Sequence, residues 1–289
     1  MKKIWNWIMG IWHAYKSLYK GRPWYIKLIS ALVTLVVLFF LYLIAVDVNF
    51  LWLFGKSPSM TTIKNKRPAE ASIIYSADGK TIGKFFSENR TPVTYEEVNP
   101  VFWKALIDTE DERFYSHHGI DYTAFAAVAK EYILHHDARG ASTITQQLAK
   151  NLFRTRSEYS TGLLGNIPGL KMLIMKSKEW ITAYKLEYFF TKNEILTQYA
   201  NTVDFGSNAF GIKTACKTYF NCKPQDLTPE NAAILVGMLK ATTYYNPLIN
   251  PENSLKRRNI VLDLMQQHGD LTAEQCDSLH CGGSPAQYL

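Results

Sequence analysis

The chain has 289 residues, of which 47% are hydrophobic, and a formal net charge of +7. Beside a membrane segment, this length leaves room for one substantial folded domain, and we expect no second catalytic domain of ordinary size. The charge alone would suit nucleic acid, anionic lipid or an acidic substrate. Since the sequence has no basic stripe with interleaved aromatic residues, we expect no nucleic-acid partner.

An uncharged run at residues 28–46 is long enough to cross a bilayer as a helix. The segment before it, residues 1–27, is basic, and Asp47 follows it, so the positive-inside rule places the N-terminus in the cytoplasm and the rest of the chain on the periplasmic or outer face. Because no small-residue cleavage site follows closely, we interpret the run as an uncleaved, single-pass anchor in the cytoplasmic (inner) membrane rather than as a signal peptide. Apolar residues at helical spacing within 1–27 predict an interfacial amphipathic helix, with a partner-binding helix as the alternative.

Beyond the anchor the pattern changes twice. Residues 47–70 form a linker, and in residues 71–98 two β-prone runs flank Asp78-Gly79, a dipeptide typical of hairpin turns. From Asn99 onward nearly every segment has a helical period. We therefore predict a mainly α protein with a small β-hairpin, a helical domain at residues 99–270 and a C-terminal tail at 271–289.

The four cysteines all lie in the part predicted to be external. Their spacings match no metal-site pattern and no paired histidines accompany them, so we expect buried or incidental thiols and no metal site. A disulfide is the alternative, because this compartment permits one. The two pairs in question are Cys216 with Cys222 and Cys276 with Cys281.

Glu110 continues the apolar side of a helix that Asn99 should cap. A carboxylate on such a stripe is costly unless it is paired or functional, whereas Asp111 and Glu112 are expected to face water. Pairing of Glu110 with Arg113 or a nearby lysine is the structural alternative. The residues that follow favour a cleft in which Glu110 transfers a proton. They are Phe114, His117 or His118, Gly119 and Asp121.

Residues 140–153 predict an anion-binding surface. Ser142 is a suitable helix cap, which would leave the backbone amides of residues 143–145 facing outward, and such a helix end binds phosphate. Two rows of polar side chains follow along this helix, although an ordinary solvated face would look similar. The rows are Ser142, Gln146 and Lys150, and beside them Thr143, Gln147 and Asn151.

A third helix is expected from Lys171. Lys176 and Glu179 lie one turn apart on it, which alone would be an ion pair of little consequence. The preceding segment, residues 154–175, is expected to be a long mobile connection, and which of Arg154 or Arg156 reaches a substrate stays open. Residues 191–194 form a capping box for the next helix.

Five segments in this order resemble the peptidoglycan glycosyltransferases of family 51, which occur as monofunctional enzymes and as the transglycosylase domain of class A penicillin-binding proteins. The likeness covers residues 71–265. The segments are EDERFYSHHGID from Glu110, GASTITQQLAKNLF from Gly140, KSKE from Lys176, KNEILTQYANTVDFG from Lys192 and AAILVGMLKATTYYNP from Ala232.

The resemblance implies a lysozyme-like domain that polymerises lipid II into glycan strands for the cell wall, with inversion and release of undecaprenyl diphosphate. By motif position, Glu110 corresponds to the general base, and Glu179 to the second carboxylate, which acts on the donor diphosphate side directly or through a cation. No cofactor is required, although Mg²⁺ or Mn²⁺ could assist at the diphosphate. The expected partners are lipid II, the growing strand, membrane lipids and, less directly, division or elongation proteins. The substrate-binding residues expected from the motifs are Asp111, Arg113, Phe114, His118, Ser142, Thr143, Gln146, Gln147, Lys150, Asn151 and Lys176.

Two departures from the family pattern matter. Met175 stands where a cation usually precedes Lys176, and the chain ends at Leu289 without the motifs of a transpeptidase. It is therefore expected to be either a monofunctional enzyme or a truncated bifunctional one. The alternative functions are a lysozyme-like lytic muramidase, which would not need the anion-binding surface, and a catalytically impaired membrane scaffold.

Overall fold

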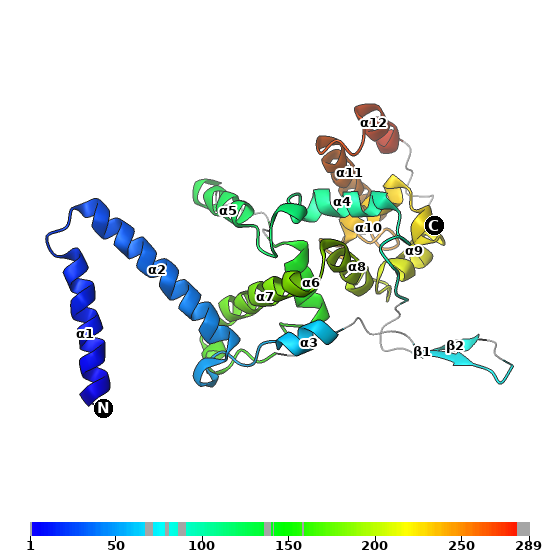
Figure 1. The fold of residues 1–289 in the computed structure, drawn as a ribbon. Helices are drawn as coiled ribbons and strands as arrows, with labels where there is room; N and C mark the ends of the chain where they lie inside the picture. Colours follow the sequence, from blue (N-terminus) through cyan, green and yellow to red (C-terminus); the bar gives the residue numbers. More distant parts are fainter. Residues whose placement is uncertain are drawn as a thin grey trace. The chain divides into compact units, whose positions relative to one another are not determined.

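The computed structural model describes residues 2–66, 72–78, 81–85, 91–135, 140, 142–157 and 159–281. These residues are mainly helical (Figure 1), which confirms the predicted fold class. The chain forms two compact units, Met1–Lys56 with Thr161–Ser177 and Ser57–Ser160 with Lys178–Leu289. Each unit is described by itself below.

The first unit contains α1 (Lys2–Tyr19) and α2 (Trp24–Asp47). Gly21, with φ of +72°, lies in the break between them. Within the described part of the chain, α2 is the one helix long and apolar enough to cross a membrane, with a mean hydropathy of 2.8 over its most apolar stretch. It begins at Trp24, four residues before the predicted run, because that run was limited to uncharged residues and the helix also includes Lys27.

Part of the connection predicted to be mobile is hydrogen-bonded within this unit. Leu164 donates its amide to the Leu53 carbonyl at 3.0 Å, and the Tyr42 and Ser177 hydroxyls lie 3.1 Å apart. Gly162, with φ of +64°, permits the approach, since a Cβ there would lie 2.4 Å from the Leu53 oxygen. The segment also contains the short 3-10 helix η3 (Leu163–Asn166), and α7 (Leu170–Phe189) begins one residue before the helix start expected at Lys171. The mobility of the connection stays a prediction.

The core of the second unit is built on two sets of packed helices. Helix α10 (Pro229–Met238) packs against α4 (Pro100–Glu110) and α11 (Pro251–Gln267), while α6 (Ile144–Leu152) packs against α8 (Lys192–Thr202). Residues 232–238 of α10 are all buried, as their uninterrupted apolar sequence predicts. The remaining elements are η1 (Phe50–Trp52) in the first unit and, in the second, α3 (Met60–Asn65), η2 (Phe114–Ser116), α5 (Tyr122–His135), α9 (Ile212–Phe220), η4 (Pro224–Asp226) and α12 (Ala273–Cys281).

The predicted hairpin is present. Strand β1 (Ser72–Tyr75) pairs antiparallel with β2 (Thr81–Phe85), with Ser72 opposite Phe85. Asp78 lies in the connection as predicted, while Gly79 falls outside the described residues. Local signals were thus sufficient for this element.

Two predicted helix starts are also confirmed. The Asn99 side chain accepts a hydrogen bond from the Val101 amide at the start of α4, and Thr191 and Glu194 form a complete capping box on α8. All four cysteines are free thiols, so neither of the disulfides considered above is formed.

Candidate active site

Glu110 lies at the last position of α4, where the buried side of the helix reaches the surface. Phe102 and Leu106, on the same side, are fully buried, whereas Glu110 is half-buried. Its Oε2 accepts a hydrogen bond from Nε2 of Gln147 at 2.6 Å. No basic side chain among the described residues is ion-paired with Glu110, and Arg113 pairs with other acids, so the structural alternative of a Glu110–Arg113 pair was wrong.

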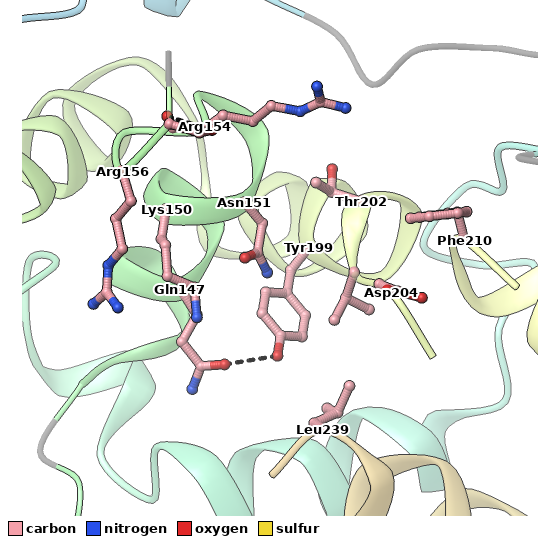
Figure 2. A pocket seen from close by; sticks show the side chains of 12 residues that line it. Gln147, Lys150, Asn151, Arg154, Arg156, Tyr199, Thr202, Asp204, Phe210 and Leu239 are labelled. Carbon is pink, nitrogen blue, oxygen red and sulfur yellow. Dashed lines mark hydrogen bonds between the residues drawn. The ribbon is translucent and has the colours of Figure 1, made fainter. Parts of the chain in front are cut away.

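Gln147 is itself held in one orientation. The hydroxyl of Tyr199, on α8, donates to Oε1 of Gln147 at 2.9 Å (Figure 2). Burial, and after it the charge of Glu110, raises the pKa of Tyr199 well above its ordinary value, so the hydroxyl keeps its proton. A donor on Oε1 leaves the amide nitrogen of Gln147 facing Glu110.

Gln147 also lines a cavity of about 530 Å³ between α6 and the end of α8. Lys150, Arg154 and Arg156 line it as well, so three cations meet at one cavity. Asn151 adds an amide, and Asp204 is the acid among the lining residues. Such a surface suits a ligand that carries several negative charges.

Glu179 is connected to this cavity through Arg156. The Nε atom of Arg156 donates to Oε1 of Glu179 at 2.8 Å, and Glu179 is only 1% exposed. A buried carboxylate needs such a partner, because an unpaired charge is costly away from water. Of the two arginines that the sequence left open, Arg156 is the one bonded to the second predicted carboxylate.

The start of α6 differs from the prediction. Its cap is Thr143, not Ser142: the Thr143 hydroxyl accepts from the Gln146 amide. The amide of Ile144, expected to face outward for phosphate, donates to Oδ2 of Asp111 at 2.9 Å. The chain's own carboxylate therefore occupies this helix end, where the dipole favours negative charge, and Asp111 is buried rather than turned toward water.

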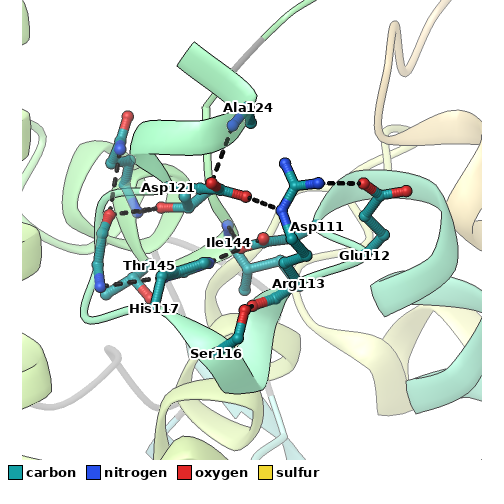
Figure 3. A network of polar contacts seen from close by, with 12 residues as sticks. Asp111, Glu112, Arg113, Ser116, His117, Asp121, Ala124, Ile144 and Thr145 are labelled. Carbon is teal, nitrogen blue, oxygen red and sulfur yellow. Dashed lines mark hydrogen bonds and ion pairs between the residues drawn. The ribbon is translucent and has the colours of Figure 1, made fainter. Parts of the chain in front are cut away.

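Asp111 anchors the loop that follows Glu110 (Figure 3). Its Oδ1 lies 2.9 Å from Nε2 of His117, and because the Gly119 amide donates to Nδ1, the Nε2 atom carries the hydrogen and donates to Asp111. The Gly119 carbonyl accepts from the side chains of Thr143 and Gln146. These bonds tie the loop to the first turn of α6.

The remaining loop residues are bound mainly to protein groups. Phe114 is fully buried, with the Lys192 ammonium 4.3 Å from its ring centroid. The Arg113 Nε donates to Asp121 at 2.8 Å. Burial acts to raise the pKa of Asp121, but hydrogen bonds from Thr123, Ala124 and Arg113 outweigh it and lower the pKa to about 2.

The predicted substrate-binding residues thus fall into groups. Gln147, Lys150 and Asn151 line the cavity. His118 is exposed, Ser142 is half-buried, and Lys176 belongs to the first unit. Arg113 is paired with Glu112 and Asp121. That any of the predicted residues contacts substrate stays a prediction. Those whose side chains are buried and hydrogen-bonded or packed within the loop network are Asp111, Phe114, Thr143 and Gln146.

The sequence missed Tyr199 and Asp204 as lining residues. Tyr199 lies four residues after Ile195 on the buried side of α8, so its spacing predicts a core aromatic. Only the position of its hydroxyl against Gln147 distinguishes it, and that depends on how α6 and α8 pack. No local sequence signal identifies Asp204.

In the part of the chain that the structure describes, the protein is mainly helical and has one helix able to span a membrane. Its cation-lined cavity is bordered by Gln147 and Arg156, which are bonded to Glu110 and Glu179. Residues 78–266 match the family described as Transglycosylase, and the chain belongs to this family. It corresponds to the family 51 glycosyltransferase domain of class A penicillin-binding proteins, as the sequence predicted.

Two curated relatives illustrate the similarity. The chain is 36% identical over 232 residues to penicillin-binding protein 1A of Escherichia coli, and 37% identical over 248 residues to penicillin-binding protein 1A/1B of Bacillus subtilis. These matches cover 80% and 85% of this chain but 26% of each relative, so the chain spans about a quarter of their length. A crystal structure of penicillin-binding protein 1A from Haemophilus influenzae aligns with a TM-score of 0.42 at 22% identity, over 75% of this chain and 21% of that one.

Proposed function

We propose that the chain is a peptidoglycan glycosyltransferase that polymerises lipid II, with inversion at the donor sugar and release of undecaprenyl diphosphate. The observation that carries this proposal is the cavity between α6 and α8. Two of its lining residues, Gln147 and Arg156, are each bonded to one of the two predicted catalytic carboxylates. Family membership supplies the substrate class.

Glu110 acts as the general base. Oε2 of Glu110 accepts a hydrogen bond from Gln147, while Oε1 of Glu110 has no hydrogen-bond partner among the described residues. The acceptor 4-hydroxyl donates its proton to Oε1 as its oxygen attacks the donor anomeric carbon. Gln147 fixes the carboxylate rotamer, so that no reorientation is needed during the transfer.

The cations of the cavity receive the leaving diphosphate. Negative charge grows on the diphosphate as the anomeric bond breaks, and Lys150, Arg154 and Arg156, which line the cavity, stabilise it. Glu179 holds the Arg156 guanidinium in place. The buried loop residues, Asp111 and its neighbours, position Glu110 rather than contact substrate.

A divalent cation at the diphosphate finds little support in the donor set. The described residues provide Asp204 as a carboxylate at the cavity, and Glu179 is already paired with Arg156. No group of three metal-ligating side chains lies at the cavity among these residues. The proposed mechanism therefore includes no metal-dependent step.

The anchor and the substrate share the membrane. We propose that α2 crosses the cytoplasmic membrane with its basic N-terminal side inside, so that the domain works on the outer face, where it meets lipid II, the growing strand and membrane lipids. The test is polymerisation of labelled lipid II by the purified protein in detergent. Formation of glycan strands supports the proposal, whereas cleavage of preformed strands without polymerisation would indicate a muramidase and overturn it.

A further inference from the structure

A cluster of three potential metal ligands lies outside the cavity, where α11 and α12 pack together. Asp263 is on α11, and Cys276 and His280 lie four residues apart on one side of α12. The three ligand atoms lie within 4.8 Å of one another. The chemistry proposed above uses none of these residues.

The triangle of donor atoms has a specific size. Sγ of Cys276 lies 3.6 Å from Nε2 of His280 and 3.8 Å from Oδ1 of Asp263, and the nitrogen and oxygen are 3.2 Å apart. Tetrahedral zinc, with the usual bond lengths to sulfur, nitrogen and oxygen, separates its ligand atoms by about 3.4 to 3.6 Å. Each edge is thus within a few tenths of an ångström of one face of a zinc tetrahedron.

Burial and charge also suit a metal. Cys276 is 3% exposed, whereas the side chains of Asp263 and His280 are 48% and 29% exposed, so the sulfur is inside and the cluster opens to solvent on one side. A metal could enter there and keep water as its fourth ligand. The thiolate and the Asp263 carboxylate would together balance a doubly charged cation.

We propose that Asp263, Cys276 and His280 bind one zinc ion that fastens α12 to α11. The mixed sulfur, nitrogen and oxygen donors favour Zn²⁺ over the hard cations Mg²⁺ and Ca²⁺, which prefer oxygen ligands. The bond would add to the existing attachment of α12, in which the buried Arg258 donates to the Leu279 carbonyl at 3.2 Å. The role is structural, and lipid II polymerisation does not depend on it.

The test is a titration of the full-length, chelator-stripped protein in detergent with Zn²⁺ alone, with metal content measured by elemental analysis. We expect one bound equivalent and a rise in Tm on binding. C276S and H280Q should each weaken binding by more than about 100-fold, since loss of even an outer-shell partner of a metal site costs 10- to 100-fold. C281S, which changes an exposed thiol next to His280, is the matched control and should bind like wild type.

Equal binding by wild type and H280Q, or loss of binding in C281S, would overturn the proposal. The wild-type protein loaded with Co²⁺ provides a readout that does not depend on whether C276S folds. A thiolate-to-cobalt charge-transfer band is expected, and its absence would mean that the three side chains form only a hydrogen-bonded triad.

Discussion

The side-chain amide of Gln147 donates a hydrogen bond to the carboxylate of Glu110, with 2.6 Å between Nε2 and Oε2. The two residues are 37 positions apart, on α6 and α4, and meet through packing of the second unit. The contact connects Glu110, at the end of α4, to the cation-lined cavity, which residues of α6 line. The hydroxyl of Tyr199 completes the arrangement by fixing the amide.

Removing the Tyr199 hydroxyl tests whether it orients the side chain of Gln147. Y199F should lower kcat about 2- to 10-fold with little change in KM, because one neutral hydrogen bond that orients Gln147 is lost and no cation is removed. The measurement is steady-state polymerisation of lipid II. Y244F, a change at an exposed tyrosine, is the control. If Y199F raises KM and leaves kcat unchanged, Tyr199 contacts substrate and does not act through Gln147.

The Arg156–Glu179 pair is expected to be energetically coupled. R156M removes one hydrogen-bonding partner of the buried Glu179 and should destabilise the protein by about 1 kcal/mol, since the arginine is partly exposed and solvent screens the pair. In the R156M/E179Q double variant the loss should be smaller than the sum of the single losses. Unfolding of all four proteins measures this, and additive losses would contradict the coupling.

Gly119 should not tolerate a side chain. Its φ is +84°, and a Cβ would lie 2.9 Å from the Ala183 carbonyl carbon on α7. G119A should destabilise the protein by about 2 to 3 kcal/mol. G269A is a matched control, because Gly269 has nearly the same φ, +83°, with nothing within 4 Å of the added Cβ. It should cost about 1 kcal/mol, and equal losses in the two variants would show that the contact with α7 is unimportant.

The lowered pKa of Asp121 predicts how the stability of the protein depends on pH. Its pKa in the folded protein is lowered to about 2 from an ordinary 3.8, so it stabilises the fold above pH 4, and this contribution disappears as the pH falls through 2. Wild type should exceed D121N in stability by about 1 to 2 kcal/mol at pH 6, and the difference should vanish near pH 2. Thermal unfolding across this range measures the difference, and a constant one would contradict the ionic role of Asp121.

Much of this arrangement could be predicted from local sequence. The cap at Asn99, the capping box at Thr191 and the hairpin at Asp78 depend on neighbouring residues, and all three are confirmed. Glu110 could be singled out because a carboxylate interrupts an apolar stripe. The start of α6 was predicted one residue early because Ser142 and Thr143 are both suitable caps.

The rest depends on contacts between segments far apart in sequence. Asp111 was expected in water because helical spacing points it away from the core, yet it follows the last residue of α4 and turns toward Ile144, 33 residues later. The bonds of Gln147 to Tyr199 and of Arg156 to Glu179 likewise join different elements. Periodicity reports which side of one helix is buried, but not which polar groups meet there.

The proposed role of Glu110 as the base of a lipid II polymerase is tested most directly by comparing wild type with E110Q in detergent with labelled lipid II. Gln keeps the size and a hydrogen-bonding group but accepts no proton. Wild type should form glycan strands and release undecaprenyl diphosphate, and E110Q should be at least about 100-fold slower while remaining folded. Failure of the wild type to form polymer, or equal rates for the two proteins, would contradict this role of Glu110.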